Sequence, residues 1–176
     1  GKIKTKLHKN EKIMLDGAHA EADAINMAGY LKKIKEPKYA IWAMMKNKEP
    51  DLFIKKFKGI FKQIITIPIE NEKNCMSAVD LKIIAKKNHF NVDKAKNFDE
   101  GIEKISSADK KLIVCLGSLY NVGNILNKNY RWGVINSSIS FSDVAPTLVP
   151  KSFPDLNNKI VGTPLTENFV GSFGWD

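Results

Sequence analysis

Between residues 12 and 129 the sequence alternates between short runs rich in β-branched and aromatic residues and longer amphipathic runs. The short runs predict strands and the amphipathic runs predict helices. Strands that alternate with helices in this way are typical of a parallel sheet with helices packed on its faces. We therefore expect an α/β fold, a doubly wound and mostly parallel sheet with helices on both faces and right-handed crossovers.

The expected elements form five strand–helix pairs. The strands are expected at residues 12–15, 39–44, 63–68, 90–93 and 111–117. The helices are expected at residues 18–34, 50–61, 77–88, 98–106 and 119–129. Ser77, at the start of the third helix, is a residue type that caps helix N-termini.

The alternation ends near residue 130, so we predict a domain over residues 1–130 and an irregular extension over residues 131–176. The extension has a net charge of −1, against +10 for the preceding residues. It holds four prolines, and its apolar residues show no sustained period. Its six aromatic residues are many for a disordered segment, so we expect part of it to pack on the domain or on another chain.

The net charge of the whole chain, +9, raises the question of nucleic-acid binding. Arg131 is the single arginine among the 28 basic residues, and the lysines are spread along most of the chain. Readout of base edges favours arginine, whereas dispersed lysines usually form a solvated surface. We therefore expect no nucleic-acid partner.

The apolar runs, such as residues 64–67 and 112–116, are far too short to span a bilayer. The basic start of the chain is not followed by an apolar signal core. These features predict a cytoplasmic chain without a membrane partner. Cys75 and Cys115 do not form a C-x-x-C pair, so we expect neither a disulfide framework nor a zinc site.

Residues 15–19 read L-D-G-A-H and follow the first expected strand directly. Because the next helix is expected to begin at Ala18, Asp16 and His19 should lie at the carboxyl edge of the sheet, where α/β proteins bind their ligands. Taken alone, an aspartate before a glycine is more often a turn or a helix cap, and a histidine in a first helical turn is more often structural.

Four segments resemble, in order and spacing, those of a known ligase family. Residues 15–19 resemble the L-D-G-A-H-N motif of folylpolyglutamate synthases and dihydrofolate synthases. Residues 43–49 resemble the G-M-L-x-D-K-D segment, residues 66–69 the strand and loop after it, and residues 115–123 the later F-G-S-L-Y-L-V-G segment. Agreement of four segments is much more specific than any single motif. The resemblance covers about residues 1–130 and corresponds to the Rossmann-like C-terminal domain of this branch of the Mur-type ligases, without its first strand.

The resemblance implies an ATP-dependent ligase that activates a folate or pteroate carboxylate as an acyl phosphate, which the amine of L-glutamate then attacks. In this family the C-terminal domain closes over a nucleotide that a preceding P-loop domain binds. ATP and Mg²⁺ are thus the implied cofactors of the intact enzyme. ATP, L-glutamate, folate and the N-terminal P-loop domain are the implied partners, and no metal ligand is expected in this chain.

Carried over to this sequence, the resemblance implies roles for four residues. Asp16 would bind the nucleotide by accepting hydrogen bonds from its ribose hydroxyl groups, which suits an ionised carboxylate. His19, the catalytic candidate, and Ser118 would hold the incoming glutamate near the acyl phosphate. Lys48 would direct positive charge toward the anionic ligands at the glutamate site.

The sequence departs from the family pattern at several positions. Ala20 and Glu21 replace the asparagine and proline that come after the histidine, Ala43 replaces a glycine, and residues 47–49 read N-K-E in place of D-K-D. The proline-glycine-arginine segment of the first strand is missing. No G-x-x-x-x-G-K-[ST] occurs in the 176 residues, so we expect the chain alone to be inactive.

Other functions stay open on the sequence alone. A metal site would need more converging ligands than Asp16 and His19, and a hydrolase would need a G-x-S-x-G motif, which is absent. A non-catalytic ligand-binding or protein-interaction module derived from the same domain fits the missing phosphate loop and the change to Ala20. A fragment of a complete ligase explains the missing strand and the missing loop together, and we prefer that hypothesis.

Overall fold

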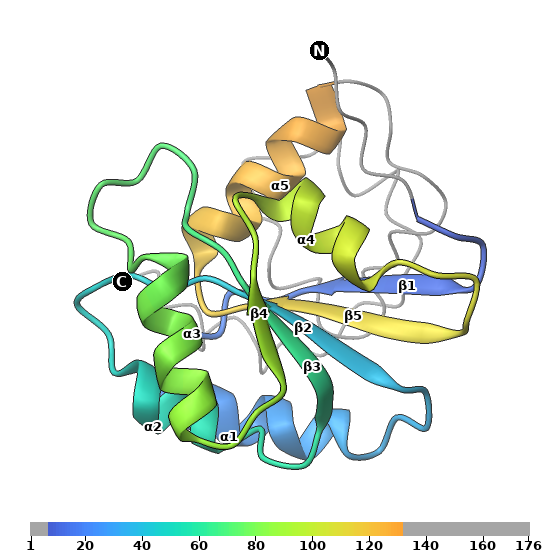
Figure 1. Cartoon of the computed structure of the whole chain (residues 1–176), viewed down its shortest axis with the longest axis horizontal. Helices are drawn as coiled ribbons and strands as arrows, with labels where there is room; N and C mark the ends of the chain where they lie inside the picture. Colours follow the sequence, from blue (N-terminus) through green and yellow to red (C-terminus); the bar gives the residue numbers. More distant parts are fainter. Residues whose placement is uncertain (1–6, 132–176) are drawn as a thin grey trace.

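The computed structural model of the chain describes residues 7–131, the last three by their backbone alone (Figure 1). These residues include most of the domain predicted over residues 1–130. The predicted extension over residues 131–176 lies outside the described residues, apart from Arg131, which ends the last helix.

Five strands alternate with five helices, which confirms the α/β fold. The strands are β1 (Glu11–Leu15), β2 (Lys38–Trp42), β3 (Phe61–Thr66), β4 (Val92–Lys94) and β5 (Lys111–Leu116). The helices are α1 (Glu21–Leu31), α2 (Pro50–Lys55), α3 (Ala78–Lys87), α4 (Phe98–Ile105) and α5 (Leu119–Arg131).

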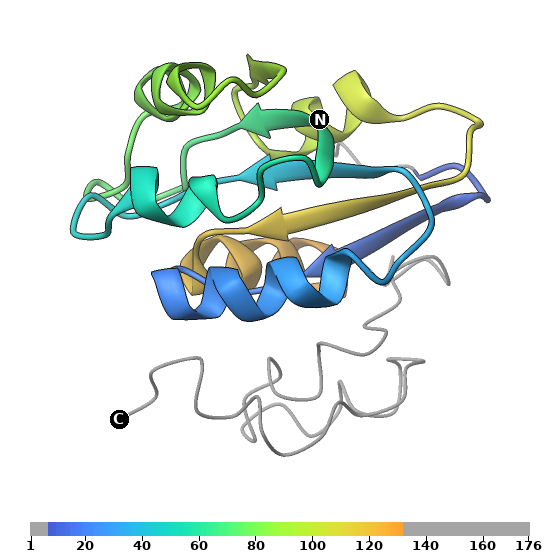
Figure 2. The same cartoon turned by 90° about the horizontal axis from the view of Figure 1, so that it is seen from below.

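The five strands form one sheet in the order β1-β5-β2-β3-β4, and every neighbouring pair is parallel. The arrowheads of neighbouring strands point the same way in Figure 2. After β4, at one edge of the sheet, the chain passes through α4 and inserts β5 between β1 and β2. Strands β2, β3 and β4 are added successively toward one edge of the sheet, whereas β5 is added back toward β1, so the order in which strands are added reverses at β5.

Helices cover both faces of the sheet, as predicted (Figure 1). Because successive strand residues point to opposite faces, Ile13 and Leu15 of β1 belong to the core on the face covered by α4 and α5, whereas Met14 belongs to the core on the face covered by α1, α2 and α3. Both faces are buried, so the strands read as continuous apolar runs rather than as alternating ones. The side chains that face the sheet recur at helical spacing, for example Ala24, Met27, Ala28 and Leu31 in α1.

The second helix is shorter than predicted. The spacing of Phe57 and Ile60 suggested a helix over residues 50–61, but α2 ends at Lys55 and residues 56–60 form a turn. Gly59 has a φ of +77°, a left-handed conformation that a helix does not allow. Phe57 still packs in the core, so its apolar character reflects burial within a turn.

The first helix begins three residues later than predicted. Ala20 is its N-cap, with an extended backbone (φ −111°, ψ 161°), and Glu21 is the first helical residue. His19 therefore lies in the loop before α1, and the prediction that it belongs to the first helical turn is wrong. The reason is local, because the Asp16 Oδ1 atom accepts a hydrogen bond from the Ala18 amide (2.6 Å) and holds residues 16–18 in a turn. At the start of α3, the predicted cap is confirmed, since Ser77 Oγ accepts from the Asp80 amide (3.0 Å).

Gly117 connects β5 to α5 through a close approach that no other residue type can make. Its φ is +101°, and a Cβ atom built there would overlap the Ala43 carbonyl oxygen. The same atom would lie 2.7 Å from Cδ1 and 2.9 Å from Nε1 of the buried Trp42 ring. The glycine thus allows β2 and the start of α5 to meet at the carboxyl edge of the sheet.

We predict that Gly117→Ala lowers the free energy of unfolding by about 3 kcal/mol or more, since it combines backbone strain with overlap in a packed core. Gly123→Ala is the matched control, because Gly123 lies in α5 and a Cβ atom there meets nothing within 4 Å. That control should gain about 0.5–1 kcal/mol from helix propensity. Urea unfolding monitored by circular dichroism measures both, and equal effects would contradict this view of the turn.

Candidate functional site

The carboxyl ends of β1, β5 and β2 form the topological switch point of this sheet. The chain leaves β1 and β2 toward the face covered by α1–α3, and leaves β5 toward the face covered by α5. Ligands of open α/β sheets bind at such points. Backbone hydrogen bonds hold the three ends level, from the Asp16 amide to the Cys115 carbonyl (2.9 Å) and from the Ala43 amide to the Leu116 carbonyl (3.3 Å).

Asp16, the residue after β1, is a buried carboxylate with one free oxygen. The residue is 1% exposed, although it follows a strand end directly. Its Oδ1 atom accepts the hydrogen bond from the Ala18 amide, whereas its Oδ2 atom is enclosed and has no partner among the described residues. The Ala18 carbonyl in turn accepts from the Gly117 amide (2.9 Å), which ties this turn to the start of α5.

Burial dominates the electrostatics of Asp16. Removal from water raises the pKa of its carboxyl from 3.8 to about 7, against the opposing effect of the Ala18 hydrogen bond and with a smaller contribution from the nearby Asp23 charge. Each pKa unit corresponds to about 1.4 kcal/mol, so the ionised side chain weakens the fold at neutral pH. A buried carboxylate with a strongly raised pKa is characteristic of binding and catalytic sites.

His19 is half-buried and its ring is fixed by the backbone. The Nδ1 atom lies 2.8 Å from the Gly17 carbonyl oxygen, which can only accept a hydrogen bond. Nδ1 must therefore carry the hydrogen in this contact, and the Nε2 atom of the neutral ring keeps a lone pair. The Asp23 carboxylate accepts from the Ala20 amide (3.3 Å) and lies 3.5 Å from the His19 amide, in place of a capping side chain on Ala20.

Ser118 stands directly before α5 and is 2% exposed. Its Oγ atom accepts a hydrogen bond from the Asn121 amide (3.4 Å), so the serine caps the helix. The hydroxyl hydrogen remains available to donate in another direction. The first turn of α5 contains no acidic residue, unlike the first turns of α1, α2, α3 and α4.

Lys48 lies six residues past the end of β2, in the loop that leads to α2, and is half-buried. Its amide donates to the Met45 carbonyl (3.3 Å), and the loop is fastened to the β3–α3 loop by the Lys46 amide on the Asn74 carbonyl (2.8 Å). The structure thus places Lys48 at the same edge of the sheet. Within the described residues it makes no ion pair or hydrogen bond with Asp16, His19 or Ser118.

The sequence was compared with profiles of known protein families. The profile described as "Dihydrofolate synthetase, C-terminal domain" matches residues 2–128. The chain belongs to this family. The match covers nearly the whole described part of the chain, including the segments that hold Asp16, His19, Lys48 and Ser118.

Solved structures that resemble this dihydrofolate synthetase C-terminal domain include folylpolyglutamate synthases. The enzyme from Thermotoga maritima is 26% identical with a TM-score of 0.57, and the match covers 76% of this chain and 32% of that one. The enzyme from Mycobacterium tuberculosis, complexed with ADP and AMPPCP, is 18% identical with a TM-score of 0.60, over 65% of this chain and 29% of that one. A bifunctional folylpolyglutamate synthase/dihydrofolate synthase from Yersinia pestis, complexed with AMPPNP and Mn, is 16% identical with a TM-score of 0.58, over 67% and 28%.

This chain therefore spans about three-tenths of the length of the solved structures that it matches. A search of curated proteins found no significant match. Among residues 7–131, no helix has the length and apolar character that crossing a membrane requires. The same residues contain no group of three or more His, Cys, Asp and Glu side chains placed to hold a metal ion.

Two residues that the sequence patterns did not single out share the switch point with Asp16. Within the part of the chain whose side chains are described, three enclosed polar atoms lack a hydrogen-bond partner: Asp16 Oδ2, Trp42 Nε1 and Asn121 Nδ2. They come from the end of β1, the end of β2 and the first turn of α5. Buried polar atoms are normally paired, so their concentration at one edge marks the place where partners are missing.

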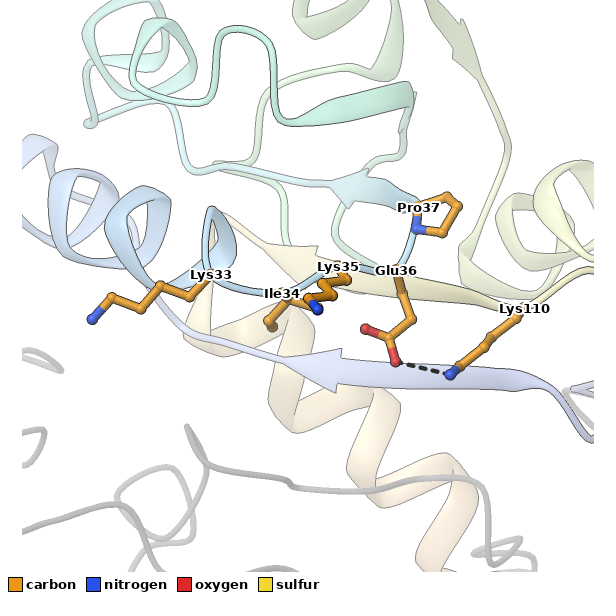
Figure 3. A pocket seen from close by; sticks show the side chains of 6 residues that line it. All are labelled: Lys33, Ile34, Lys35, Glu36, Pro37 and Lys110. Carbon is orange, nitrogen blue, oxygen red and sulfur yellow. Dashed lines mark ion pairs between the residues drawn. The ribbon is translucent and has the colours of Figure 1, made fainter.

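A hollow on the opposite edge of the domain is less suited to this chemistry. It lies beside the amino ends of β2 and β5 and is lined by Lys33, Ile34, Lys35, Glu36, Pro37 and Lys110 (Figure 3). The Glu36 carboxylate pairs with the Lys110 ammonium across it (3.3 Å), and the hollow is open to solvent. None of the predicted site residues lines it.

The elevated pKa of Asp16 predicts a specific pH dependence of stability. Between pH 3.8 and about 7 the folded state binds more protons than the unfolded state, so the wild-type chain loses stability as the pH rises through this window. The Asp16→Asn side chain cannot ionise, so its stability does not fall in this window. The free energy of unfolding of the variant, relative to wild type, should therefore rise by about 2–3 kcal/mol from pH 5 to pH 8. Urea unfolding at both pH values measures the advantage.

Asp93→Asn is the control. Hydrogen bonds from Lys104 and Lys82 lower the pKa of the Asp93 carboxyl, so its contribution is lost only as the pH falls through the acid range. The difference between this variant and wild type should stay constant from pH 5 to pH 8. An Asp16→Asn difference that is equally constant would contradict the buried, proton-binding carboxyl.

Proposed function

We propose that the chain is the C-terminal domain of an ATP-dependent ligase that joins L-glutamate to a folate or pteroate carboxylate through an acyl phosphate. In this proposal residues 7–131 supply part of the ATP-ribose site and part of the glutamate site. A preceding P-loop domain supplies the phosphate site, so the isolated chain binds its ligands weakly and does not catalyse ligation. Family membership and the arrangement of Asp16, His19 and Ser118 support the proposal.

The observation that carries the proposal is the enclosed, unpartnered Oδ2 atom of Asp16. A carboxylate is an acceptor without a donor of its own, and two neighbouring hydroxyl groups are a suitable pair of donors for it. Hydrogen bonds from a ribose would stabilise the charged form that burial disfavours. The buried, ionised Asp16 destabilises the free domain, and hydrogen bonds from a bound nucleotide would offset part of this destabilisation.

His19 is assigned to the amine of glutamate. The amine must lose a proton as its nitrogen forms the bond to the acyl carbon and phosphate leaves. The His19 Nε2 lone pair, fixed by the Nδ1 contact with Gly17, can accept that proton or orient the amine through a hydrogen bond. The fixed tautomer makes His19 an acceptor, which suits an amine more than a carboxylate.

Ser118 and the start of α5 are assigned to a carboxylate of the glutamate. A helix N-terminus presents free backbone N–H groups and favours negative charge. Since α5 has no acidic residue in its first turn, this preference is not satisfied by its own side chains. Lys48 adds a positive charge at the same edge. ATP arrives with Mg²⁺ in the intact enzyme, and we assign no residue of this chain as a ligand of the metal.

The second candidate is a binding or interaction module that has lost the ligase reaction. Ala20, the N-cap of α1, favours this second candidate. Its side chain makes no capping hydrogen bond, and the side-chain amide that the family pattern has beside the histidine is missing. A module that has also lost its nucleotide site would no longer distinguish nucleotides by their ribose, and this difference can be measured.

We predict that the chain binds ADP with a dissociation constant in about the millimolar range, and 2′,3′-dideoxy-ADP at least about fivefold more weakly, as expected for the loss of charge-assisted hydrogen bonds. Both nucleotides carry the same phosphates, so the ratio isolates the ribose. In Asp16→Asn the ratio should fall toward one, while Asp93→Asn should keep it. NMR titration measures the affinities, and a ratio of one in the wild-type chain would contradict the ribose site.

We also predict that the purified chain shows no ATP- and glutamate-dependent ligation of folates. Joined to a P-loop domain of the family in a complete enzyme, His19→Ala should raise the KM for glutamate far more than the KM for the folate. Measurable turnover by the isolated chain, or equal effects on the two KM values, would contradict the assigned roles.

A further inference from the structure

Asn121, in the first turn of α5, is a buried amide whose nitrogen has no hydrogen-bond partner among the described residues. The residue is 4% exposed and its Nδ2 atom is enclosed. A buried donor without an acceptor destabilises a fold, so an apolar side chain of similar size would stabilise the free domain. The resembling family segment has leucine at this position. The asparagine therefore destabilises the free domain, unless a bound ligand supplies an acceptor for its Nδ2–H group.

The position of Asn121 is fixed by contacts on both sides. Its backbone amide donates to Ser118 Oγ (3.4 Å), which places the residue one turn along α5 from the serine. Asn124 and Lys128, three and seven residues further on, share its side of the helix. They bind Glu70 of the β3–α3 loop, through the Asn124 Nδ2 atom on the carbonyl (2.8 Å) and the Lys128 ammonium on the carboxylate (2.7 Å). Asn121 thus lies where the start of α5 meets this loop.

The surroundings of Asn121 supply donors and no negative charge from α5 itself. The backbone N–H groups of the first turn, the Ser118 hydroxyl and the Asn121 amide are all able to donate, and the first turn holds no acidic residue. An anion with two oxygens, held at the helix start, would satisfy the serine and the asparagine together. A carboxylate has this geometry and fits against one turn of a helix.

We propose that Asn121 is a binding residue of the glutamate subsite, where its Nδ2–H group donates to a carboxylate oxygen of L-glutamate beside Ser118. The inference rests on the proposed function, because it takes the substrate class from there. It adds a residue that the family pattern does not contain and that distinguishes this chain from relatives with an apolar residue at the same point.

The test uses the full 176-residue chain, with L-glutamate and inorganic phosphate as probes in NMR titrations. The side-chain amide resonances of Asn121 should shift as glutamate is added, with the same midpoint as the backbone resonance of Leu119. Asn121→Leu should weaken glutamate binding about tenfold, since a hydrogen bond to a charged group is worth about 1.5–3 kcal/mol. The same variant should unfold at a higher urea concentration than wild type.

An Asn121→Leu variant that is more stable to urea but binds glutamate more weakly is not expected if Asn121 is purely structural. Asn121→Asp is the second variant, nearly identical in shape, and the added negative charge should abolish glutamate binding even if the leucine packs poorly. Asn124→Ala is the matched control, because its amide already has an acceptor in Glu70. It should lose stability and keep the wild-type affinity for glutamate.

The outcomes separate the inference from the proposed function. If Ser118→Ala weakens glutamate binding and Asn121→Leu does not, the role of Asn121 is wrong and the glutamate site stands. If neither variant changes the affinity, or if the wild-type chain shows no shift at saturating glutamate, the glutamate site and the inference both fail. If phosphate shifts the Asn121 amide and glutamate does not, the subsite belongs to a phosphate and the inference is wrong.

Discussion

The enclosure of the Asp16 carboxyl at the end of β1 is the constraint on which the site depends. A carboxylate that leaves water must gain hydrogen bonds, lose its charge or weaken the fold. Asp16 gains one hydrogen bond, from Ala18, but burial still raises the pKa of its carboxyl to about 7. Its second oxygen has no hydrogen-bond partner among the described residues. The domain is therefore built around an acceptor whose donor is absent from residues 7–131, and the donor is what a ligand would bring.

The topology determines where this acceptor lies. Because β5 is inserted between β1 and β2, the direction of winding reverses at β5. Asp16 and Ser118, the residue that caps α5, therefore follow neighbouring strands. Gly117 makes the junction possible, since any side chain there would collide with Ala43 and Trp42. This closely packed turn also brings the residues assigned to the two ligands to one edge of the sheet. At the same edge, three polar atoms have no hydrogen-bond partner within residues 7–131.

Hydrophobic periodicity was sufficient to predict the five strands, the five helices and their parallel arrangement. It failed at α2, where apolar residues buried in a turn imitate a helix around Gly59, and at the start of α1, where the Asp16 turn delays the helix beyond His19. The position of Asp16 and His19 directly after the first strand made them candidates. The resemblance to the ligase family supplied their roles and added Ser118 and Lys48. Sequence patterns could not reveal the unpaired Trp42 and Asn121 atoms, because hydrogen-bond satisfaction depends on the three-dimensional neighbours of each atom. Asn121 did leave one signal, as a polar residue where the family segment is apolar.

The pKa of Asp16, read from the chemical shift of its carboxyl carbon in the free chain and in the presence of ADP, tests the ribose site most directly. We expect a pKa near 7 in the free chain, caused by burial, and a clear decrease when ribose hydroxyl groups donate to the carboxylate. A pKa close to 3.8 in the free chain would show that the carboxyl is not desolvated. A high pKa that ADP leaves unchanged would show that the missing partner of Asp16 is not the ribose.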